Sequence, residues 1–246
     1  MGGQSIGYMN CYLMRYIDRK LPVIMRLYVQ FFSFLFSLNL LLPSQVVSQT
    51  NFYEDPRFPA IANSHEVIAV LPFDATVTLR PRQMKDMTSD QLERMEKAEG
   101  DGIQAAMYSW FLKRKKRGSL KIDVQSPNVT NAKLIKNGVT PETLAAYEPG
   151  ELCAFLGVDA VIMGTFSTNK PMSQGAAIAL GVLFGVAGST EKAVINLNVY
   201  DAGTGDLMCS YMKNVNGGLG STSEDLVNVL MRKASRRIAY TKNVTD

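Results

Sequence analysis

AVINLNVYDAGTGDLMCSYMKNV, residues 193–215, is the stretch that decides the fold. In its first part Ile195, Leu197 and Val199 alternate with polar or aromatic residues, which is the period of a strand with one buried face. The segment DAGTGD, residues 201–206, then supplies the glycines that a chain reversal needs. Alternation resumes over residues 207–212. The stretch therefore predicts a β-hairpin, and because a lone hairpin is only marginally stable, we expect further strands and a covering layer.

The composition is that of a folded, globular protein. Of 246 residues, 46% are hydrophobic and 20% are charged, which argues against wholesale disorder. The formal net charge is +4, but residues 1–48 hold four basic residues and one acidic residue, so the remainder carries 22 basic and 21 acidic residues. A nearly neutral domain has no overall field with which to gather polyanions. We therefore expect no nucleic-acid partner.

The N-terminal 48 residues predict two segments that precede the folded domain. Residues 1–24 show no clear period, and we interpret them as an upstream extension that results from a mis-set start, with Met25 as the true first residue. Residues 25–48 hold a basic residue, an apolar run and a polar end, the order of a secretory signal peptide cleaved before Gln49. A membrane anchor is the alternative, but the run of 16 residues contains four polar ones, and about 20 apolar residues are needed to cross a bilayer. No cysteine directly follows the run, so a lipid anchor is not predicted.

The rest of the chain predicts a tether and one α/β domain. Residues 49–64 contain two prolines and no strong period, and we expect them to be the tether; the domain spans residues 65–240. Besides the hairpin, strand patterns occupy residues 67–73, 120–124 and 158–166, with a charged loop expected over 74–87. Helix patterns occupy residues 89–116, 140–156 and 222–240. The alternating order implies parallel pairing of the first three strands. We predict a mixed five-stranded sheet, three parallel strands plus the C-terminal hairpin, packed with helices.

Cap residues mark the expected helix ends. Thr88 and Gln91 have the spacing of a capping box. Thr140 followed by Pro141 predicts a second helix start, and Gly157 a helix end.

A run of five cations ends the first helix: Lys113, Arg114, Lys115, Lys116 and Arg117. Cations at a helix C-terminus face the negative end of the helix dipole, which is one interpretation of the run. The other is a contact patch for anionic lipid head groups or for an acidic partner.

Residues 171–190 contain no charged residue, which sets them apart as an apolar, glycine-rich insertion. Its apolar centre, residues 176–188, is too short to cross a bilayer as a single helix. Gly181 and Gly185 form a GxxxG pair, which lets two helix backbones approach closely. One interpretation is a segment tucked against the sheet. The other is a membrane or oligomer contact through Gly181, Leu183, Phe184 and Gly185.

Groups that could carry a reaction are few. His65 is the single histidine, and beside the first strand we interpret it as a surface residue. No metal-binding, phosphate-loop or nucleophile motif is present, so we predict no metal, no cofactor and no enzymatic activity. Asp201 is expected to be an ordinary turn residue. Cys153 and Cys209 could pair in an oxidising compartment, although two buried thiols are an equal alternative.

Three stretches together resemble a known family: HEVIAVLPFD (65–74), ELCAFLGVDAVIMGTF (151–166) and INLNVYDAGTGDLMCSY (195–211). In this order they look like the envelope domain shared by the curli secretion protein CsgG, the penicillin-binding-protein activator LpoB and the N-terminal domain of TolB. The resemblance covers about residues 65–240 and implies a CsgG/LpoB-like fold and a non-enzymatic role in the bacterial envelope. Members such as CsgG and LpoB are lipoproteins, and the channel-forming branch inserts long strand hairpins; neither feature is evident here.

These observations lead to two hypotheses about function. The first is an exported periplasmic protein, associated with the outer membrane or not, that binds an envelope protein partner in envelope assembly or secretion. The second is a membrane-associated oligomeric transport or secretion accessory that inserts residues 171–190. A homo-oligomer and a peripheral membrane contact are compatible with both.

Overall fold

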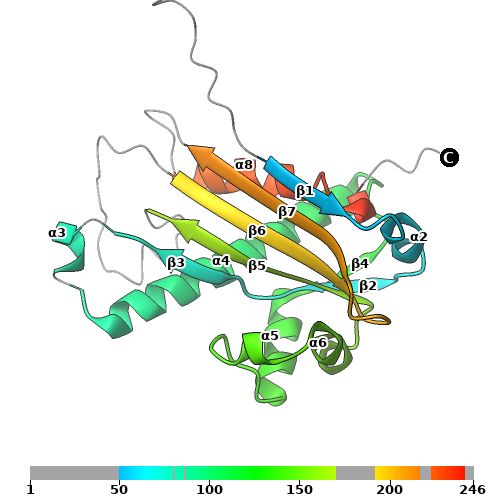
Figure 1. Cartoon of the computed structure of the whole chain (residues 1–246), viewed down its shortest axis with the longest axis horizontal. Coiled ribbons are helices and arrows are strands. Elements are labelled where there is room, and N and C mark those ends of the chain that lie inside the picture. The colour runs from blue at the N-terminus through cyan, green and yellow to red at the C-terminus, as the bar shows by residue number, and fades with distance from the viewer. Residues whose placement is uncertain (1–49, 80, 86, 170–191, 217–222, 242–246) are drawn as a thin grey trace, which may run out of the picture. The chain divides into compact units, whose positions relative to one another are not determined.

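The computed structural model describes residues 50–79, 81–85, 87–169, 192–216 and 223–241, all within one compact unit, Ser48–Asp246. In these ranges the chain forms a seven-stranded mixed sheet with helices packed on it (Figure 1). The strands are β1 (Thr50–Glu54), β2 (Val67–Val70), β3 (Asp74–Val77), β4 (Asp123–Gln125), β5 (Ala160–Thr168), β6 (Lys192–Asp201) and β7 (Leu207–Asn216). The helices are α2 (Phe58–Ala62), α3 (Pro81–Met84), α4 (Ser89–Lys116), α5 (Pro127–Lys136), α6 (Pro149–Leu156) and α8 (Ser223–Ala234), with short 3-10 turns η1 (Leu144–Ala146) and η2 (Ala239–Thr241).

The sheet has the predicted mixture of parallel and antiparallel strands. Its order is β1-β7-β6-β5-β2-β4, and β3 pairs with β5 off this path. β2 runs parallel to both β4 and β5, as expected for strands joined through helices. The hairpin β6–β7 adds antiparallel to β5. The predicted fold class is confirmed, with two more strands than expected among the described residues.

The two additional strands come from segments expected to be irregular. The tether predicted over residues 49–64 is wrong for most of its length, because β1 pairs antiparallel with β7 along five residues and α2 follows it. Phe52 and Tyr53 of β1 are 37% and 51% exposed, so this edge strand lacks the alternation that would reveal it. The loop predicted over residues 74–87 likewise contains β3 and α3.

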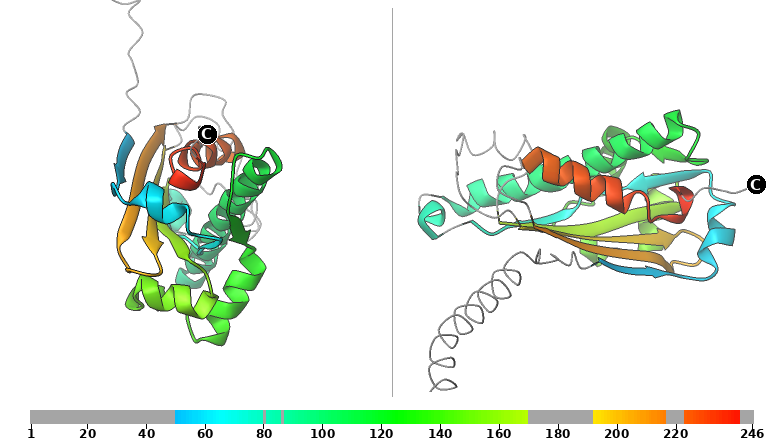
Figure 2. Two further views of the ribbon diagram at one scale, coloured as in Figure 1. Left: turned by 90° about the vertical axis from the view of Figure 1, so that its right-hand side faces the viewer. Right: turned by 90° about the horizontal axis from the view of Figure 1, so that it is seen from above.

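Helices cover the central strands on both faces. α4 and α8 lie side by side on one face, over a core that includes Ile68, Val70 and the inward side chains of β6 (Figure 2). α5 and α6 cover the other face of β2 and β5, where Ala69 and Leu71 pack with Leu152. Successive residues of β2 therefore point into opposite cores, which explains why its sequence is apolar without alternation.

β2 and β3 are two parts of one strand, interrupted by a one-residue bulge. Val70 pairs with Ile162 of β5, but Asp74 pairs with Thr165, so four residue steps on one strand oppose three on the other. The extra residue falls at Pro72–Phe73, where the proline has no N–H to donate to a ladder. Bulges bend a strand and redirect its side chains, and they are frequent beside functional sites.

Two glycines make room for the bulge. A Cβ on Gly100 of α4 would lie 2.1 Å from the carbonyl oxygen of Phe73, and one on Gly164 of β5 would lie 2.7 Å from the Phe73 ring. The buried side chain of Gln104 donates to the carbonyl of Val70 at 2.7 Å, just before the bulge. Gly100 lies inside one unbroken 28-residue helix and permits this close approach.

The predicted helix ends are confirmed where residues adjacent in the sequence form the cap. The capping box of Thr88 and Gln91 is confirmed, and Gly157 ends α6 with a left-handed φ of 61°. The helix start predicted at Thr140 is wrong: residues 140–143 form a turn, and α6 begins at Pro149 after an N-cap at Glu148. The C-terminal helix predicted over 222–240 ends at Ala234, and the turn η2 follows.

Replacing Gly100 by alanine tests the fit between α4 and the bulge. The added methyl group would overlap the Phe73 carbonyl, and we expect Gly100→Ala to lower the free energy of unfolding by about 1–3 kcal/mol. Gly102→Ala is the matched control, because two residues along a helix place the methyl on the opposite side and add about 1 kcal/mol of helix propensity. Urea unfolding measures both. Equal stabilisation by the two variants would contradict the close approach.

Candidate functional site

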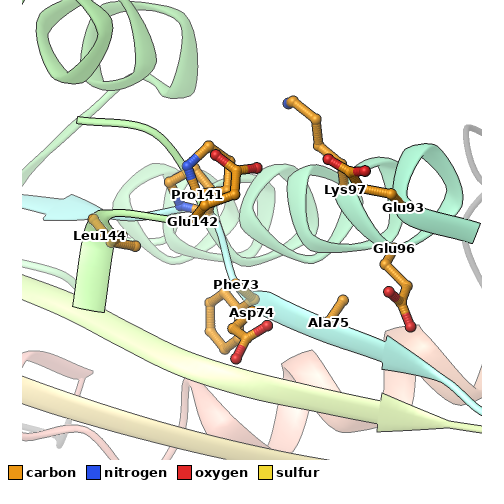
Figure 3. A pocket seen from close by; sticks show the side chains of 10 residues that line it. Phe73, Asp74, Ala75, Glu93, Glu96, Lys97, Pro141, Glu142 and Leu144 are labelled. Atoms are coloured by element: carbon orange, nitrogen blue, oxygen red, sulfur yellow. The ribbon is translucent and has the colours of Figure 1, made fainter. Parts of the chain in front are cut away.

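The bulge opens a cleft between three segments of the chain. Its volume is about 180 Å³, and its wall combines the bulge, the first half of α4 and the turn before η1 (Figure 3). The residues that line it are Pro72, Phe73, Asp74, Ala75, Glu93, Glu96, Lys97, Pro141, Glu142 and Leu144. We call this the acidic cleft. It lies just beyond the carboxyl end of β2, the strand that has parallel partners on both sides, which is where open α/β sheets commonly bind ligands.

Carboxylates dominate the rim of the acidic cleft. The described lining holds four carboxylates, those of Asp74, Glu93, Glu96 and Glu142, and one ammonium group, that of Lys97. Lys97 is in turn paired with Asp101, one helical turn along α4, at 2.7 Å. A hydrogen bond from Thr140, the backbone amide of Glu142 itself and the charge of Lys97 lower the pKa of Glu142, which keeps this exposed carboxylate ionised. The cleft therefore presents an excess of negative charge.

A second, apolar hollow of about 200 Å³ adjoins the cleft. The two share Pro72, Lys97, Pro141 and Leu144. The apolar hollow adds Leu134, Ile135 and Val139 from the end of α5 and the segment after it. Ile135 is 74% exposed, the most among the large hydrophobic residues that are exposed in the described ranges. Acidic and apolar surfaces thus meet at one place.

This site did not emerge from the sequence, although one signal pointed to it. A proline inside a predicted central strand contradicts an unbroken ladder and indicates an edge or a bulge. Pro72 stands in that position within the strand predicted over residues 67–73. The other residues that line the cleft belong to segments up to about 70 positions from Pro72 in the sequence. Only the tertiary fold brings these segments close to Pro72.

The prediction that His65 is a surface residue is wrong. The side chain is 5% exposed and lies between two partners that are distant in the sequence. Its Nε2 is 2.8 Å from Oδ1 of Asp201 in the hairpin turn, and its Nδ1 is 2.7 Å from the hydroxyl oxygen of Tyr240. We call these three residues the buried triad. It joins the start of β2, the hairpin and the C-terminal turn η2.

Asp201 determines one hydrogen bond of the buried triad. A carboxylate only accepts, so Nε2–H of His65 donates to Asp201, while Nδ1 lies within hydrogen-bond distance of the Tyr240 hydroxyl. Burial, and then the charges of Asp201 and Asp159, raise the pKa of Tyr240, so this hydroxyl keeps its proton. Tyr240 is 7% exposed and Asp201 is 5% exposed. With no open face toward solvent, the triad resembles a catalytic relay only in its connectivity and is suited to holding elements together.

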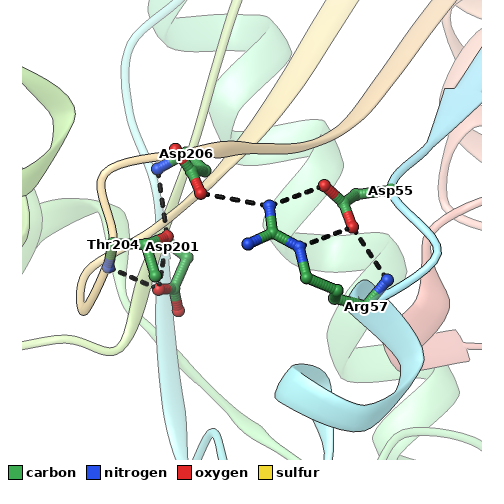
Figure 4. Close-up of polar contacts among 5 residues, drawn as sticks. All are labelled: Asp55, Arg57, Asp201, Thr204 and Asp206. Atoms are coloured by element: carbon green, nitrogen blue, oxygen red, sulfur yellow. Dashed lines mark hydrogen bonds and ion pairs between the residues drawn. The ribbon is translucent and has the colours of Figure 1, made fainter.

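Asp201 is the centre of that connection. Burial alone would raise the pKa of this carboxyl, but hydrogen bonds from the backbone of Thr204, from His65 and from the Thr204 hydroxyl outweigh it, so the pKa lies below the ordinary 3.8. The turn prediction for Asp201 is therefore confirmed, with the histidine contact in addition. Nearby, Arg57 bridges Asp55 at 2.8 Å and Asp206 at 3.1 Å, which ties α2 to the same turn (Figure 4).

The cationic run 113–117 ends α4 as predicted, and three of its side chains have intramolecular contacts. Lys113 lies over the ring of Trp110 at 4.3 Å, Arg114 donates to the hydroxyl of Ser235 at 3.1 Å, and Lys115 pairs with Asp123. Lys116 and Arg117 are exposed. The suggested anionic contact patch stays a prediction.

Two other site predictions differ in their outcome. The suggested disulfide between Cys153 and Cys209 is not formed, because the two residues are buried in different hydrophobic clusters: Cys153 packs with α6, and Cys209 packs in the core under α4 and α8. Burial raises the pKa of the Cys153 thiol to about 12, so it stays protonated. Gly181, Leu183, Phe184 and Gly185 of the insertion 171–190, like the signal peptide 25–48, lie outside the described residues and stay predictions.

Within the described ranges, no three histidine, cysteine or acidic side chains are grouped closely enough to hold a metal ion. In the same part of the chain, no helix is both long enough and apolar enough to span a membrane.

No family model matches the sequence, and no curated protein matches it. Solved structures do match. PelC from Paraburkholderia phytofirmans, solved as a dodecamer, is 12% identical over 80% of this chain and 100% of PelC, with a TM-score of 0.42. The lipoprotein GNA1162 from Neisseria meningitidis is 15% identical over 73% of this chain and 99% of its own, with a TM-score of 0.41. The C-terminal domain of LpoB from Salmonella enterica is 10% identical over 62% of this chain and 83% of its own, with a TM-score of 0.33.

The resemblance to LpoB that the three sequence stretches predict is thus found among solved structures. Similarity at this level concerns the fold alone, and it identifies neither a ligand nor a partner for this chain.

Asp201→Asn tests whether the buried triad fastens the hairpin turn. Because the pKa of Asp201 is depressed in the folded chain, its charge contributes stability that is present above pH 3.8 and lost as the pH falls through the native pKa. We expect the variant to lose about 1.5–3 kcal/mol of unfolding free energy at neutral pH. The difference from the wild type should shrink in acid, where Asp201 itself is protonated.

Asp206→Asn is the matched control for urea unfolding at both pH values. Asp206 lies in the same turn but is half exposed, and its ion pair with Arg57 is at the surface, so we expect a loss of under about 1 kcal/mol. A loss for Asp201→Asn as small as that of the control would show that the triad contributes little.

Proposed function

We propose that this chain is an exported, non-enzymatic protein of the bacterial cell envelope that acts by binding another protein, in envelope assembly or secretion. The observation that carries the proposal is the acidic cleft with its adjoining apolar hollow. The contact it offers suits an extended partner segment that presents lysine or arginine next to an apolar side chain.

The size of the two hollows favours side chains of a protein over a small molecule. Each measures about 200 Å³ or less, whereas sites that enclose a small ligand usually have about 300–1,000 Å³. A hollow of this size accepts one or two side chains. Two hollows that share Pro72 and Leu144 suit neighbouring residues of one bound segment.

The charge of the rim sets the chemistry of the partner. Among the described residues that line the two hollows, five are carboxylates and one, Lys97, is a cation. Glu96 is held in place because it accepts from the backbone N–H of Val77 at 3.0 Å, and Asp101 is held by Lys97. Fixed carboxylates of this kind favour a basic segment and repel an acidic one, which gives specificity and speeds association.

The non-enzymatic part of the proposal has separate support. A general base must reach the group whose proton it takes, and the single histidine, His65, is enclosed with Asp201 and Tyr240. Among the described residues of the cleft wall, no histidine, cysteine or serine lies beside these carboxylates. That composition is suited to electrostatic recognition rather than to nucleophilic chemistry.

Site-specific photo-crosslinking in the producing cells tests the proposal. A photoreactive phenylalanine analogue at Leu144, which lines both hollows, should give an adduct of discrete mass whose second component is one exported protein. The same analogue at Val129 is the matched control, since Val129 is an exposed apolar residue of α5 that does not line either hollow. We expect no adduct there.

Charge reversal separates recognition from chance proximity. Glu93→Lys combined with Glu142→Lys should reduce the Leu144 adduct at least about tenfold, because two attractive charges become repulsive. Glu66→Lys changes an exposed carboxylate outside the cleft and should leave the adduct intact. An adduct that survives the double reversal, or no adduct at all, would contradict the assignment of the cleft.

A further inference from the structure

The second charged surface of the molecule lies at the other end of α4. Residues 112–122 hold six basic residues and no acidic one, and residues 226–241 hold four basic residues and no acidic one. α4 and α8 lie side by side, so these two stretches, more than 100 positions apart in the sequence, form one surface (Figure 2). We call this the cationic surface.

Specific contacts join the two stretches. Arg114 of α4 donates to Ser235, which directly follows α8. Burial, and then the nearby charges of Arg236 and Arg117, lower the pKa of Arg114. On the other side of α8, burial and the charges of Lys233 and Arg237 lower the pKa of Lys213 on β7. Like charges are therefore close to one another across all three elements.

The helix dipole does not account for this accumulation. A helix C-terminus carries the equivalent of about half a negative charge. Against it stand five cations at the end of α4 and four at the end of α8, of which Lys115 is paired with Asp123. The bulk of the positive charge is left to face outward, where an anionic surface would neutralise it.

Apolar groups within the cationic surface distinguish a membrane from an acidic protein as its occupant. Leu112 is 43% exposed amid the basic run, and the ring of Trp110 lies half-buried beneath Lys113. At 100° per residue, Leu112, Lys113, Lys116 and Arg117 fall within an arc of about 140° on the solvent side of α4. An exposed leucine among lysine and arginine, with a half-buried tryptophan beside it, is typical of helices that lie at a lipid interface.

We propose that the cationic surface, formed by the C-terminal ends of α4 and α8, docks the domain peripherally on a bilayer rich in anionic phospholipid. The side chains that make the contact are Lys113, Lys116, Arg117, Arg232, Lys233, Arg236 and Arg237, with Leu112 at the interface. This surface is distinct from the acidic cleft, which α4 carries in its other half. Docking would hold the acidic cleft away from the lipid, free for a protein.

Vesicle flotation tests the proposal on the purified full chain. Binding to vesicles that contain phosphatidylglycerol should exceed binding to pure phosphatidylcholine vesicles at least tenfold at about 0.05 M salt and should largely disappear at about 0.5 M salt. Arg232→Gln combined with Arg236→Gln should weaken binding about 30-fold, roughly fivefold for each cation removed. Lys85→Gln with Lys136→Gln, two exposed lysines elsewhere, is the matched control and should bind like the wild type.

Each outcome decides the proposal. Equal binding to both kinds of vesicle, or binding that the arginine variant retains, would mean that other residues contact the membrane, and would overturn it. Inorganic phosphate that competes away the vesicles at low millimolar concentration would indicate a site for a free anion rather than a docking surface, and would overturn it as well. Thermal unfolding of each variant confirms that the fold is kept, because the exchanged side chains are exposed. Vesicle binding does not depend on the Leu144 crosslink. The proposal about the cationic surface and the proposal about the acidic cleft can therefore fail separately.

Discussion

The close packing of α4 against the bulge at Pro72–Phe73 is the constraint on which the rest of the structure depends. Gly100 allows the helix backbone to reach the Phe73 carbonyl, and Gly164 allows the Phe73 ring to lie across β5. The bulge shifts the register between β3 and β5 by one residue, so the later side chains point to the opposite face from the one they would occupy in an unbroken strand. The acidic cleft lies where the bulge bends the strand between β2 and β3. Asp74 and the carboxylates of α4 line the space that the bend opens.

The buried triad supplies a second constraint, at the opposite end of β2. His65 lies just before β2 and is hydrogen-bonded to Asp201 of the hairpin turn and to Tyr240 of the C-terminal turn. Asp159 accepts from the backbone N–H groups of Glu66 and Val67, so the same entry point is also fixed to β5. One end of the central strand is therefore closed by hydrogen bonds, while the other end is open at the cleft. α4 also differs between its ends, with carboxylates at the cleft and cations beside α8.

Local patterns in the sequence predicted the parts of the fold that local physics decides. The hairpin, the three parallel strands and the capping box at Thr88 followed from periodicity and from cap chemistry. Thr140–Pro141 and Glu148–Pro149 offer nearly the same helix-start signal, and only tertiary packing selects the second. β1 was missed because its side chains are exposed on an edge. The cleft and the triad could not be predicted, because each joins segments that are from 18 to 175 positions apart in the sequence. The proline inside the predicted strand was the one local sign.

Amide chemical shifts of the isotope-labelled chain, recorded during titration with a short peptide of alternating lysine and leucine, test the central claim most directly. We predict saturable shifts confined to residues 72–75, 93–101 and 134–144, suppressed by salt and absent with a matched glutamate–leucine peptide. The backbone amides that flank Gly100 should move with those of the bulge, since the two segments are in contact. Shifts that lie elsewhere, or that occur equally with both peptides, would contradict the assignment of the acidic cleft as a site for a basic, apolar partner segment.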